Sequence, residues 1–192
     1  IGKSIKYYTR NYVDFYKIAS YELLWDELIQ KCALKGKRLV LSTGMATMPE
    51  IKHAVHVVLD NTKEKPILLH CVSGYPTPID QVNLSAIESI SNATKCCVGW
   101  SDHSVSPAVI NRAVNKWGAN FIEFHLDLDE KGDEYKAGHC WLPNEIKEVI
   151  YNLRGIVDID GNGEKVPQNA ELSDRLWRAD PEDGLRPFKE VR

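Results

Sequence analysis

Two histidines have a spacing that suits a metal ion. His103 and His125 each end an apolar, strand-like run, and these two runs follow one another along the chain. On neighbouring strands the two imidazoles would converge. With a carboxylate and water they would form an octahedral site for a divalent ion such as Mn²⁺. Asp102 or Asp127 would then orient the rings through hydrogen bonds. The alternative is that one or both histidines are core or loop residues with satisfied hydrogen bonds.

A lysine within an otherwise apolar run is the second feature that suits chemistry. Lys17 lies in Tyr16-Lys17-Ile18-Ala19, where a buried ammonium would need an anion beside it. It would bind a phosphate or carboxylate as a point charge, or form a Schiff base with a carbonyl. The alternative is an edge lysine that faces solvent.

Four serines stand where strand-like runs give way to helical stretches. Hydroxyl and backbone N–H groups at such turns can cradle a phosphate, although each serine alone is more often a helix cap. The four are Ser20, Ser42, Ser73 and Ser101. The sequence contains no G-x-G-x-x-G, Walker A or G-x-S-x-G motif. Nucleotide binding and an α/β-hydrolase triad therefore lose support.

An alternation of β-rich runs and amphipathic stretches must position these side chains. We expect strands over residues 16–19, 38–43, 66–72, 97–101 and 120–126, and helices over residues 22–34, 48–59, 84–93, 107–117 and 143–153. Thr47 and Glu50 fit a capping box, and Gly36 fits a helix stop. Strict alternation with apolar strands predicts a parallel sheet that is covered on both faces.

Polar side chains gather at the C-terminal ends of the expected strands, where parallel α/β enzymes place their active sites. His139 lies in the loop after the fifth run and is a candidate for substrate contact. A closed (β/α)8 barrel takes about 250 residues. Five modules fill this chain, so they form either an open sheet or the last five strands of a barrel. We expect one α/β domain over residues 1–155 and an extended polar tail over 156–192.

Composition excludes several classes of protein. The 192 residues have a net charge of −3, with 43% hydrophobic and 27% charged residues, which is ordinary for a globular domain. No basic stripe is present, so neither nucleic acid nor a membrane is an expected partner. No apolar run approaches a membrane span, and from these residues we expect no signal peptide. The five cysteines form no C-x-x-C pair, and Cys71, Cys96 and Cys97 lie in apolar, strand-like runs. We therefore expect buried thiols and a cytoplasmic, reducing compartment.

In combination, the motifs resemble the sialic acid synthase family, the N-acetylneuraminate synthases. The resemblance runs from about Asp14 to Leu153. It rests on Lys17-Ile18-Ala19-Ser20 with Glu22, Leu41-Ser42-Thr43-Gly44-Met45, Leu69-His70-Cys71-Val72-Ser73-Gly74-Tyr75-Pro76, Val82-Asn83-Leu84, Gly99-Trp100-Ser101-Asp102-His103-Ser104 and Glu123-Phe124-His125.

The resemblance implies a fold and a reaction. The fold is a TIM barrel, (β/α)8, of which this chain covers strands four to eight. The reaction condenses phosphoenolpyruvate with an N-acetylated amino sugar such as N-acetylmannosamine, in its open-chain aldehyde form, and releases phosphate. By matching position, His103 and His125 bind the metal, with Mn²⁺ preferred, and Tyr75 lies beside the sugar. Phosphoenolpyruvate is held by Lys17, Ser20, Ser42, Ser73 and Ser101. We expect Glu134 (or Asp133) and Asp102 to be the catalytic carboxylates, one of which activates the attacking water.

The chain also departs from the family. A Glu and a second Lys from the family's first three strands are not located, and Ala19 and Tyr21 alter the first motif. We expect no antifreeze-like domain of the family's kind in residues 156–192, and Arg178 or Arg186 of this tail is the candidate to replace that domain's sugar-binding arginine. We therefore expect a homodimer or a preceding segment. Two other functions stay open: a Schiff-base aldolase that uses Lys17, and a non-catalytic sugar-binding remnant.

Overall fold

The computed structural model describes residues 13–192, with the side chains of residues 156–158 left out. The chain forms two compact units, Ile1–Leu153 and Arg154–Arg192. The first twelve residues of the α/β domain predicted over 1–155 lie outside the described residues. No helix in the described part is long and apolar enough to cross a bilayer.

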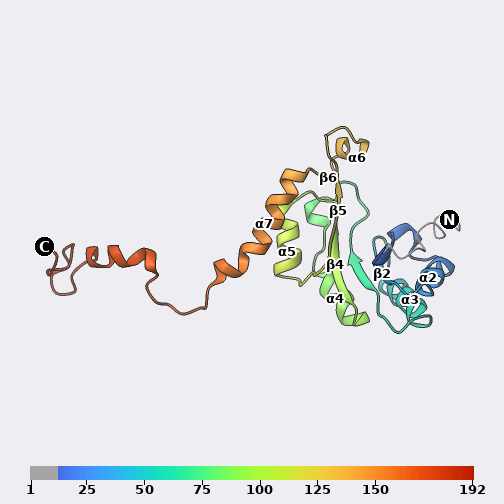
Figure 1. Cartoon of the computed structure of the whole chain (residues 1–192), viewed down its shortest axis with the longest axis horizontal. Helices are drawn as coiled ribbons and strands as arrows, with labels where there is room; N and C mark the ends of the chain where they lie inside the picture. The colour runs from blue at the N-terminus through green and yellow to red at the C-terminus, as the bar shows by residue number, and fades with distance from the viewer. Residues whose placement is uncertain (1–12) are drawn as a thin grey trace. The chain divides into compact units, whose positions relative to one another are not determined.

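Six strands form a parallel sheet in the first unit, and their spatial order follows the sequence (Figure 1). They are β1 (Phe15–Ile18), β2 (Arg38–Ser42), β3 (Ile67–His70), β4 (Cys97–Asp102), β5 (Ile122–Leu126) and β6 (Cys140–Trp141). Each neighbouring pair is parallel. The parallel α/β arrangement that the sequence predicts is thus confirmed.

Two contacts show that this sheet is strongly curved. Lys17 Nζ on β1 lies 3.4 Å from Glu123 Oε2 on β5. The rings of Phe15 and Phe121 stand edge to face with centroids 5.9 Å apart. In a flat sheet β1 and β5 would lie about 19 Å apart, since neighbouring strands are spaced by about 4.8 Å. The strands therefore wrap around a concave face as a half-barrel.

The helices that connect the strands follow the expected order. They are α2 (Asp26–Ala33), α3 (Met48–Leu59), α4 (Ala86–Thr94), α5 (Pro107–Asn115) and α7 (Pro143–Asp160), with the short 3₁₀ turns η1 (Ser20–Glu22) and η2 (Ile79–Gln81). Helix α3 begins with the expected capping box, in which Thr47 N–H donates to Glu50 Oε2 at 2.7 Å. The helix expected over 22–34 begins only at Asp26, because Trp25 leaves the helical backbone at φ −95° and ψ 84°.

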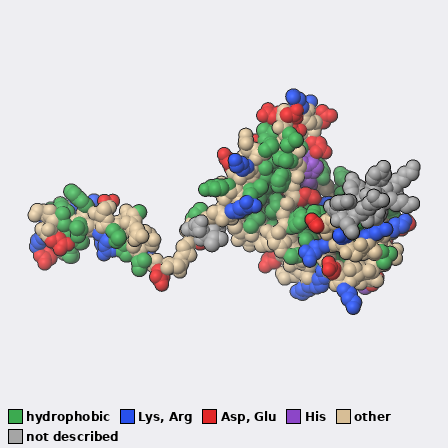
Figure 2. All heavy atoms as spheres, in the orientation of Figure 1, with side chains coloured by type: hydrophobic (Ala, Val, Ile, Leu, Met, Phe, Trp, Pro, Cys, Tyr) green, Lys and Arg blue, Asp and Glu red, His purple; other side chains and the backbone are tan. Residues whose placement is uncertain are grey.

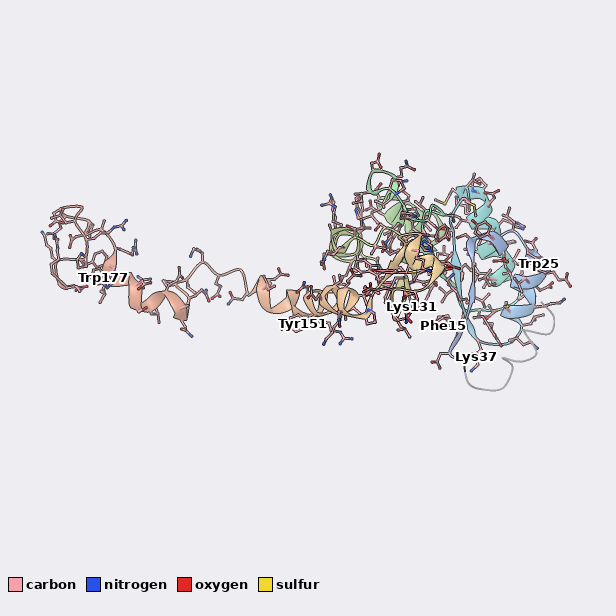
Figure 3. The ribbon with its side chains drawn as sticks, turned by 90° about the horizontal axis from the view of Figure 1, so that it is seen from above. Phe15, Trp25, Lys37, Lys131, Tyr151 and Trp177 are labelled. Atoms are coloured by element: carbon pink, nitrogen blue, oxygen red, sulfur yellow. The ribbon has the colours of Figure 1, made fainter. Side chains whose placement is uncertain are left out.

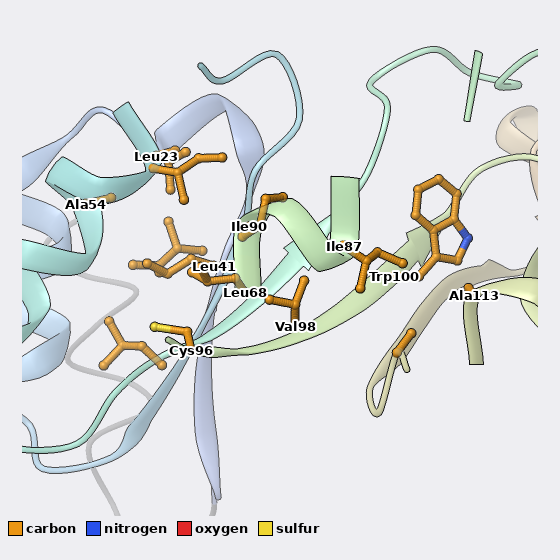
Figure 4. Close-up of a cluster of buried hydrophobic side chains, with 14 of the residues drawn as sticks. Leu23, Leu41, Ala54, Leu68, Ile87, Ile90, Cys96, Val98, Trp100 and Ala113 are labelled. Carbon is orange, nitrogen blue, oxygen red and sulfur yellow. The ribbon is translucent and has the colours of Figure 1, made fainter. Parts of the chain in front are cut away.

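The hydrophobic core lies between the sheet and its helices (Figure 4). Alternate strand residues point to this side, because side chains of a strand alternate between the two faces of a sheet. On the strands they include Leu41, Leu68, Val98 and Trp100, and on the covering segments they include Leu23, Ala54, Ile87, Ile90 and Ala113. The intervening strand residues face the concave side, where the candidate site lies.

The loop after β5 is more structured than the sequence predicts. It contains the one-turn helix α6 (Asp133–Lys136) and the two-residue strand β6. Helix α7 also runs seven residues beyond its expected end at Leu153, to Asp160. The helix α6 and the strand β6 are too short for a hydrophobic period to be read from the sequence.

The second unit is mostly exposed and polar, and it is not uniformly extended. It contains the 3₁₀ segment η3 (Asn169–Trp177). Beyond η3, the buried carboxylate of Asp180 accepts N–H groups of Glu182 and Lys189 at 2.9 and 2.7 Å. These local hydrogen bonds fold the segment into turns. In each unit an aromatic side chain points to solvent: Tyr151 on α7 and Trp177 on η3 (Figure 3).

All five cysteines lie in the described part and are free thiols. Cys32, Cys71, Cys96 and Cys140 are buried, which confirms the expectation for Cys71 and Cys96. Cys97 is exposed, which corrects the expectation that the Cys96–Cys97 pair is buried as a whole. The two residues are consecutive on an extended backbone, so their side chains point in opposite directions.

Candidate functional site

Strand register places the candidate residues on the concave face. Residues that pair across parallel strands share a face of the sheet. Lys17 pairs with Val40, and neither residue belongs to the helix-facing core, so both face the concave side. Two residues further along β2, Ser42 pairs with Leu69 on the same face. Ser101 pairs with Glu123 at the next level. Alternation along β5 then adds His125, two residues beyond Glu123, at the C-terminal edge.

A group of hydroxyls surrounds Gly44, just after β2. Gly44 N–H donates to Ser20 Oγ at 3.0 Å. A Cβ atom at Gly44 would lie 2.3 Å from Ser73 Oγ and 2.8 Å from Ser20 Oγ, so only glycine lets these hydroxyls approach. The hydroxyls of Ser42 and Ser73 are buried and have no hydrogen-bond partner in the described structure. Such groups are costly unless a ligand or water binds them.

Lys17 lies on the same concave face, on β1. Its Nζ donates to Ile18 O at 3.2 Å and pairs with Glu123 Oε2 at 3.4 Å. The other oxygen of Glu123 accepts the hydroxyl of Ser101 at 2.8 Å. One carboxylate thus connects the ammonium of β1 to the hydroxyl of β4. Glu123 was expected only as one of several polar residues at a strand end, and this bridging role depends on the curvature of the sheet.

Three histidines and a tyrosine form an aromatic cluster beside these groups. The ring centroids of His103 and His125 lie 5.3 Å apart, and those of His125 and His139 lie 5.1 Å apart. Tyr75 packs against all three rings, with centroid distances of 4.2 Å to His103, 5.9 Å to His125 and 5.1 Å to His139. Histidine reaches the surface of this unit next to acidic side chains (Figure 2).

Hydrogen bonds orient two of the imidazoles. His103 Nδ1 lies 2.9 Å from Val72 O, so Nδ1 carries a proton and Nε2 is left as an acceptor. His125 Nδ1 lies 2.9 Å from Glu134 Oε2. Burial lowers the pKa of His103, and the hydrogen bond with His125 lowers the pKa of Glu134. A neutral imidazole and an ionised carboxylate are the forms that bind a metal ion.

Four of the described side chains bring potential ligand atoms close together. One atom from each of His125, Glu134, His139 and Cys140 lies within 4.8 Å of the other three. The Nδ1 atom of buried His139 has no hydrogen-bond partner in the described structure. The donor types and this unpartnered nitrogen fit a divalent cation. His103 lies beside this group but does not belong to it.

Asp102 supports the site from behind. Its fully buried carboxylate accepts the indole N–H groups of Trp100 and Trp141 at 3.0 and 2.9 Å. It also accepts the hydroxyl of Ser104 at 2.6 Å and the N–H of Val105 at 3.1 Å. These bonds hold Val105 at a φ of 50°, which is strained for a β-branched residue. The contacts favour a positioning role for Asp102 over the catalytic role expected from the sequence.

The sequence predicts that Asp102 or Asp127 orients the histidine rings. This prediction is wrong, because neither carboxylate forms a hydrogen bond with a histidine in the described structure. Asp127 accepts the N–H groups of Asp129, Glu130 and Gly132 and shapes the loop after β5. Val72 O and Glu134 orient the rings instead. The sequence did not single out Cys140 as a site residue. Its pairing with His125 across β5 and β6 brings it to the site, and a pairing of this kind cannot be read from the sequence.

Comparison with known proteins agrees with this architecture. The chain is 36% identical over 160 residues to the N,N'-diacetyllegionaminic acid synthase of Campylobacter jejuni. This match covers 81% of this chain and 47% of that protein. It is similar to the crystal structure of N-acetylneuraminic acid (sialic acid) synthetase from Leptospira borgpetersenii in complex with citrate. That match has a TM-score of 0.71 and 33% identity over 85% of this chain and 56% of that one.

A more distant neighbour shares the fold alone. Phospho-2-dehydro-3-deoxyheptonate aldolase (DAHP synthase) from Thermotoga maritima is 16% identical, with a TM-score of 0.62 over 78% of this chain and 47% of that one. The chain spans about half the length of the curated relatives it matches. A model of the NeuB family matches residues 2–165. The chain therefore belongs to the NeuB family.

Proposed function

We propose that this chain is part of a synthase that condenses phosphoenolpyruvate with an N-acetylated amino sugar to give a nonulosonic acid and phosphate. Its described strands would correspond to strands four to eight of a TIM barrel, with β6 as a short addition. Residues 1–155 would form the barrel portion and 156–192 a separate tail. One observation carries the proposal. The unpartnered, buried hydroxyls of Ser42 and Ser73 and the ammonium of Lys17, together called the anion cradle, share one concave face with the histidine cluster.

The cradle suits phosphoenolpyruvate because this substrate carries a phosphate and a carboxylate. The hydroxyls of Ser42 and Ser73 have no partner and are available to donate to an oxyanion. Ser20 and Gly44 line the same space, and Lys17 supplies positive charge. Together they would hold the enol fragment in a fixed orientation, which lowers the entropic part of the barrier.

The histidine cluster is proposed to receive the aldehyde of the sugar. His103 and His125 would hold a divalent cation, for which the resemblance predicts Mn²⁺. When bound, such an ion polarises a carbonyl oxygen as a Lewis acid. Tyr75 contacts both rings and would border the sugar. Burial raises the pKa of the Tyr75 phenol, so the phenol stays protonated and can donate to a sugar oxygen.

The reaction then forms a carbon–carbon bond and a bond from C2 to the water oxygen, and it breaks the bond from C2 to the phosphate oxygen. C3 of phosphoenolpyruvate attacks the aldehyde carbon, and the aldehyde oxygen takes a proton to become a hydroxyl. Positive charge develops at C2, water adds there, and the tetrahedral intermediate expels inorganic phosphate. Glu134 is the proposed base for the water, since its carboxylate lies in the histidine cluster, with Oε2 2.9 Å from His125 Nδ1.

The Schiff-base alternative is less well supported. A Schiff base requires a neutral lysine amine. Lys17 instead pairs with the carboxylate of Glu123, an arrangement that suits the ammonium form. Borohydride trapping with pyruvate would label Lys17 only in an aldolase. A non-catalytic binding protein would bind sugar without releasing phosphate.

Phosphoenolpyruvate binding to this chain, measured by titration calorimetry, tests the cradle. A charge-assisted hydrogen bond contributes about 1.5–3 kcal/mol, so Lys17→Met is expected to weaken binding roughly tenfold to a hundredfold. Lys31→Met is the matched control, because Lys31 pairs with Glu27 on the surface of α2. Equal affinity in all three proteins would contradict the cradle. Phosphate release in the presence of N-acetylmannosamine tests the reaction itself.

A further inference from the structure

Basic residues gather at the N-terminal ends of the strands, at the edge of the sheet opposite the anion cradle. A row of Cα partners crosses β2, β3 and β4 there and consists of Val40, Ile67 and Cys97. Two residues before each partner stand Arg38, Lys65 and Lys95, which we call the basic row. The basic row therefore lies at about one level of three strands spaced by about 4.8 Å. Lys65 Nζ donates to Lys95 O at 3.0 Å, which shows that these two residues are neighbours.

The positive charge of the basic row is not compensated within the described side chains. None of its three members belongs to an ion pair there. Glu64 precedes Lys65 in the chain and Asp14 lines a cavity beside Arg38, yet neither pairs with the row. Residues 1–12 contain no Asp or Glu, so they add no acidic side chain. Like charges this close repel one another, and an anionic ligand would relieve that repulsion.

Two adjoining cavities open beside the basic row. The first has a volume of about 490 Å³, and its lining includes Arg38, Cys97 and Asn120. The second has a volume of about 400 Å³, and its lining includes Lys95 together with the same Cys97 and Asn120. The two shared residues make the cavities continuous. Sites for small molecules are typically concave and measure about 300–1,000 Å³, so this edge has the size of such a site.

The second cavity combines a ring-sized apolar wall with amide groups. Trp117 and Ile87 contribute apolar surface, and Asn92 and Asn120 contribute amides that can both donate and accept hydrogen bonds. Lys116 Nζ lies 5.1 Å from the centroid of the Trp117 ring, which adds a fourth cation beside the cavity. The arrangement suits an organic group that is attached to a strongly anionic one.

We propose that this edge of the sheet binds a small molecule that carries a polyphosphate group, with the phosphates on the basic row and the attached organic group in the cavity beside Trp117. Guanidinium and ammonium groups are the usual side-chain partners of phosphate. Several adjacent cations match a polyphosphate better than a single carboxylate. The sequence shows no basic run here, because each member of the row precedes or begins a different strand.

This site does not rest on the proposed function. On β4, Ser101 stands four residues beyond Cys97, which corresponds to about 13 Å along an extended strand. The basic row and the anion cradle are therefore separate, and each can fail without the other.

Titration calorimetry of the whole chain with tripolyphosphate, in the presence of EDTA, tests the proposal. EDTA removes divalent ions that could bind phosphate at the histidine cluster. We expect saturable binding of one tripolyphosphate. The double variant Lys65→Met with Lys95→Met should bind about tenfold more weakly, since each exposed charge pair changes affinity by up to about fivefold. Lys52→Met, which removes an exposed lysine on α3, is the matched control and should bind like the parent.

Two further readouts separate this site from the anion cradle and from a structural role. Lys17→Met should keep the tripolyphosphate affinity, and the double variant should keep the phosphoenolpyruvate affinity. Tripolyphosphate should raise the melting temperature of the parent but raise that of the double variant much less, because a ligand of the folded state stabilises it. Without ligand, the double variant should melt no lower than the parent, since it loses only repulsion.

Three outcomes would overturn the inference. These are no saturable binding to a parent chain whose circular dichroism shows it to be folded, equal affinity in the parent and the double variant, and an equal loss in Lys52→Met. ATP tests the cavity beside Trp117. It should bind more tightly than tripolyphosphate, and Trp117→Leu should remove the difference. Equal affinity of the parent for ATP and tripolyphosphate would overturn the role of that cavity.

Discussion

At the scale of single residues, the site depends on buried hydroxyls that have no hydrogen-bond partner and on side chains that only the folded chain brings into contact. Ser42 and Ser73 keep unpartnered hydroxyls in a buried region, which their residue type alone does not reveal. The sequence predicts these serines and Lys17 because they end or interrupt apolar runs. It does not predict that Glu123 pairs with Lys17 or that Cys140 lies beside His125, because both contacts depend on where whole strands are placed.

Gly44→Ala is expected to weaken phosphoenolpyruvate binding about tenfold while leaving thermal stability within a few degrees. The added Cβ would displace the hydroxyls of Ser20 and Ser73, which are the ends of side chains that can rotate away. Titration calorimetry and a thermal melt measure the two effects. Gly155→Ala is the control, since a Cβ there meets nothing within 4 Å. A large fall in melting temperature would show that the glycine is structural instead.

His70 is expected to make the fold sensitive to acid. Burial lowers the pKa of His70, while its Nε2 donates to Val82 O at 3.0 Å. The unfolded chain, with a histidine pKa of about 6.5, then binds the proton more tightly than the folded chain. The stabilisation is complete above pH 6.5 or so and is lost as the pH falls through the lower, folded pKa.

Urea unfolding at pH 7.5 and at pH 5.5 or so measures this pH dependence. His70→Gln keeps a donor for Val82 O and should reduce the loss of stability on acidification. His103 also has a lowered pKa, so part of the dependence should remain. Exposed His56→Gln should behave like the parent. Identical pH dependence in the parent and His70→Gln would contradict the role of His70.

At the scale of elements, the sequence predicts the alternation well and the short insertions poorly. The five main strands and their following helices have hydrophobic periods long enough to read, and the Thr47–Glu50 capping box marks the start of α3. The strand β6 has two residues and α6 has four, so neither shows a period. Yet β6 carries Cys140, and Trp141 connects it to Asp102 on β4.

Asp102→Asn is expected to destabilise the fold by roughly 3 kcal/mol, because an amide nitrogen would face indole N–H donors and leave buried donors without an acceptor. Urea unfolding measures this loss. Asp127→Asn, at a loop carboxylate that accepts three backbone N–H groups, should cost clearly less stability than Asp102→Asn. Comparable losses in the two variants would mean that Asp102 does not hold β4 and β6 together.

At the scale of the whole molecule, the described core belongs to the first unit. Its last buried apolar side chain along the chain is Val149, and the second unit buries only Asp180 among its described side chains. Curvature is the property of this scale that the pattern of strands and helices does not predict, although the family resemblance implies it. Alternating strands and helices are equally consistent with an open, nearly flat sheet, and only contacts between β1 and β5 exclude that arrangement.

Deletion of residues 161–192 is therefore expected to leave cooperative unfolding intact, with a melting temperature changed by less than about 4 °C. Differential scanning calorimetry measures both properties. A matched deletion of 143–192 removes Ile146 and Val149 from the core and should abolish the cooperative transition. Loss of cooperativity in the shorter deletion would show that the second unit is required for the fold.

The ion pair between Lys17 and Glu123 has a consequence for folding kinetics. It joins residues about a hundred positions apart, and contacts of such high sequence separation carry a large loop-closure entropy. Neighbouring strands can associate one after another, but the ammonium meets its carboxylate only once all the intervening strands have curved. The anion cradle is then among the last features to assemble during refolding, and ligand binding should recover later than β-sheet circular dichroism.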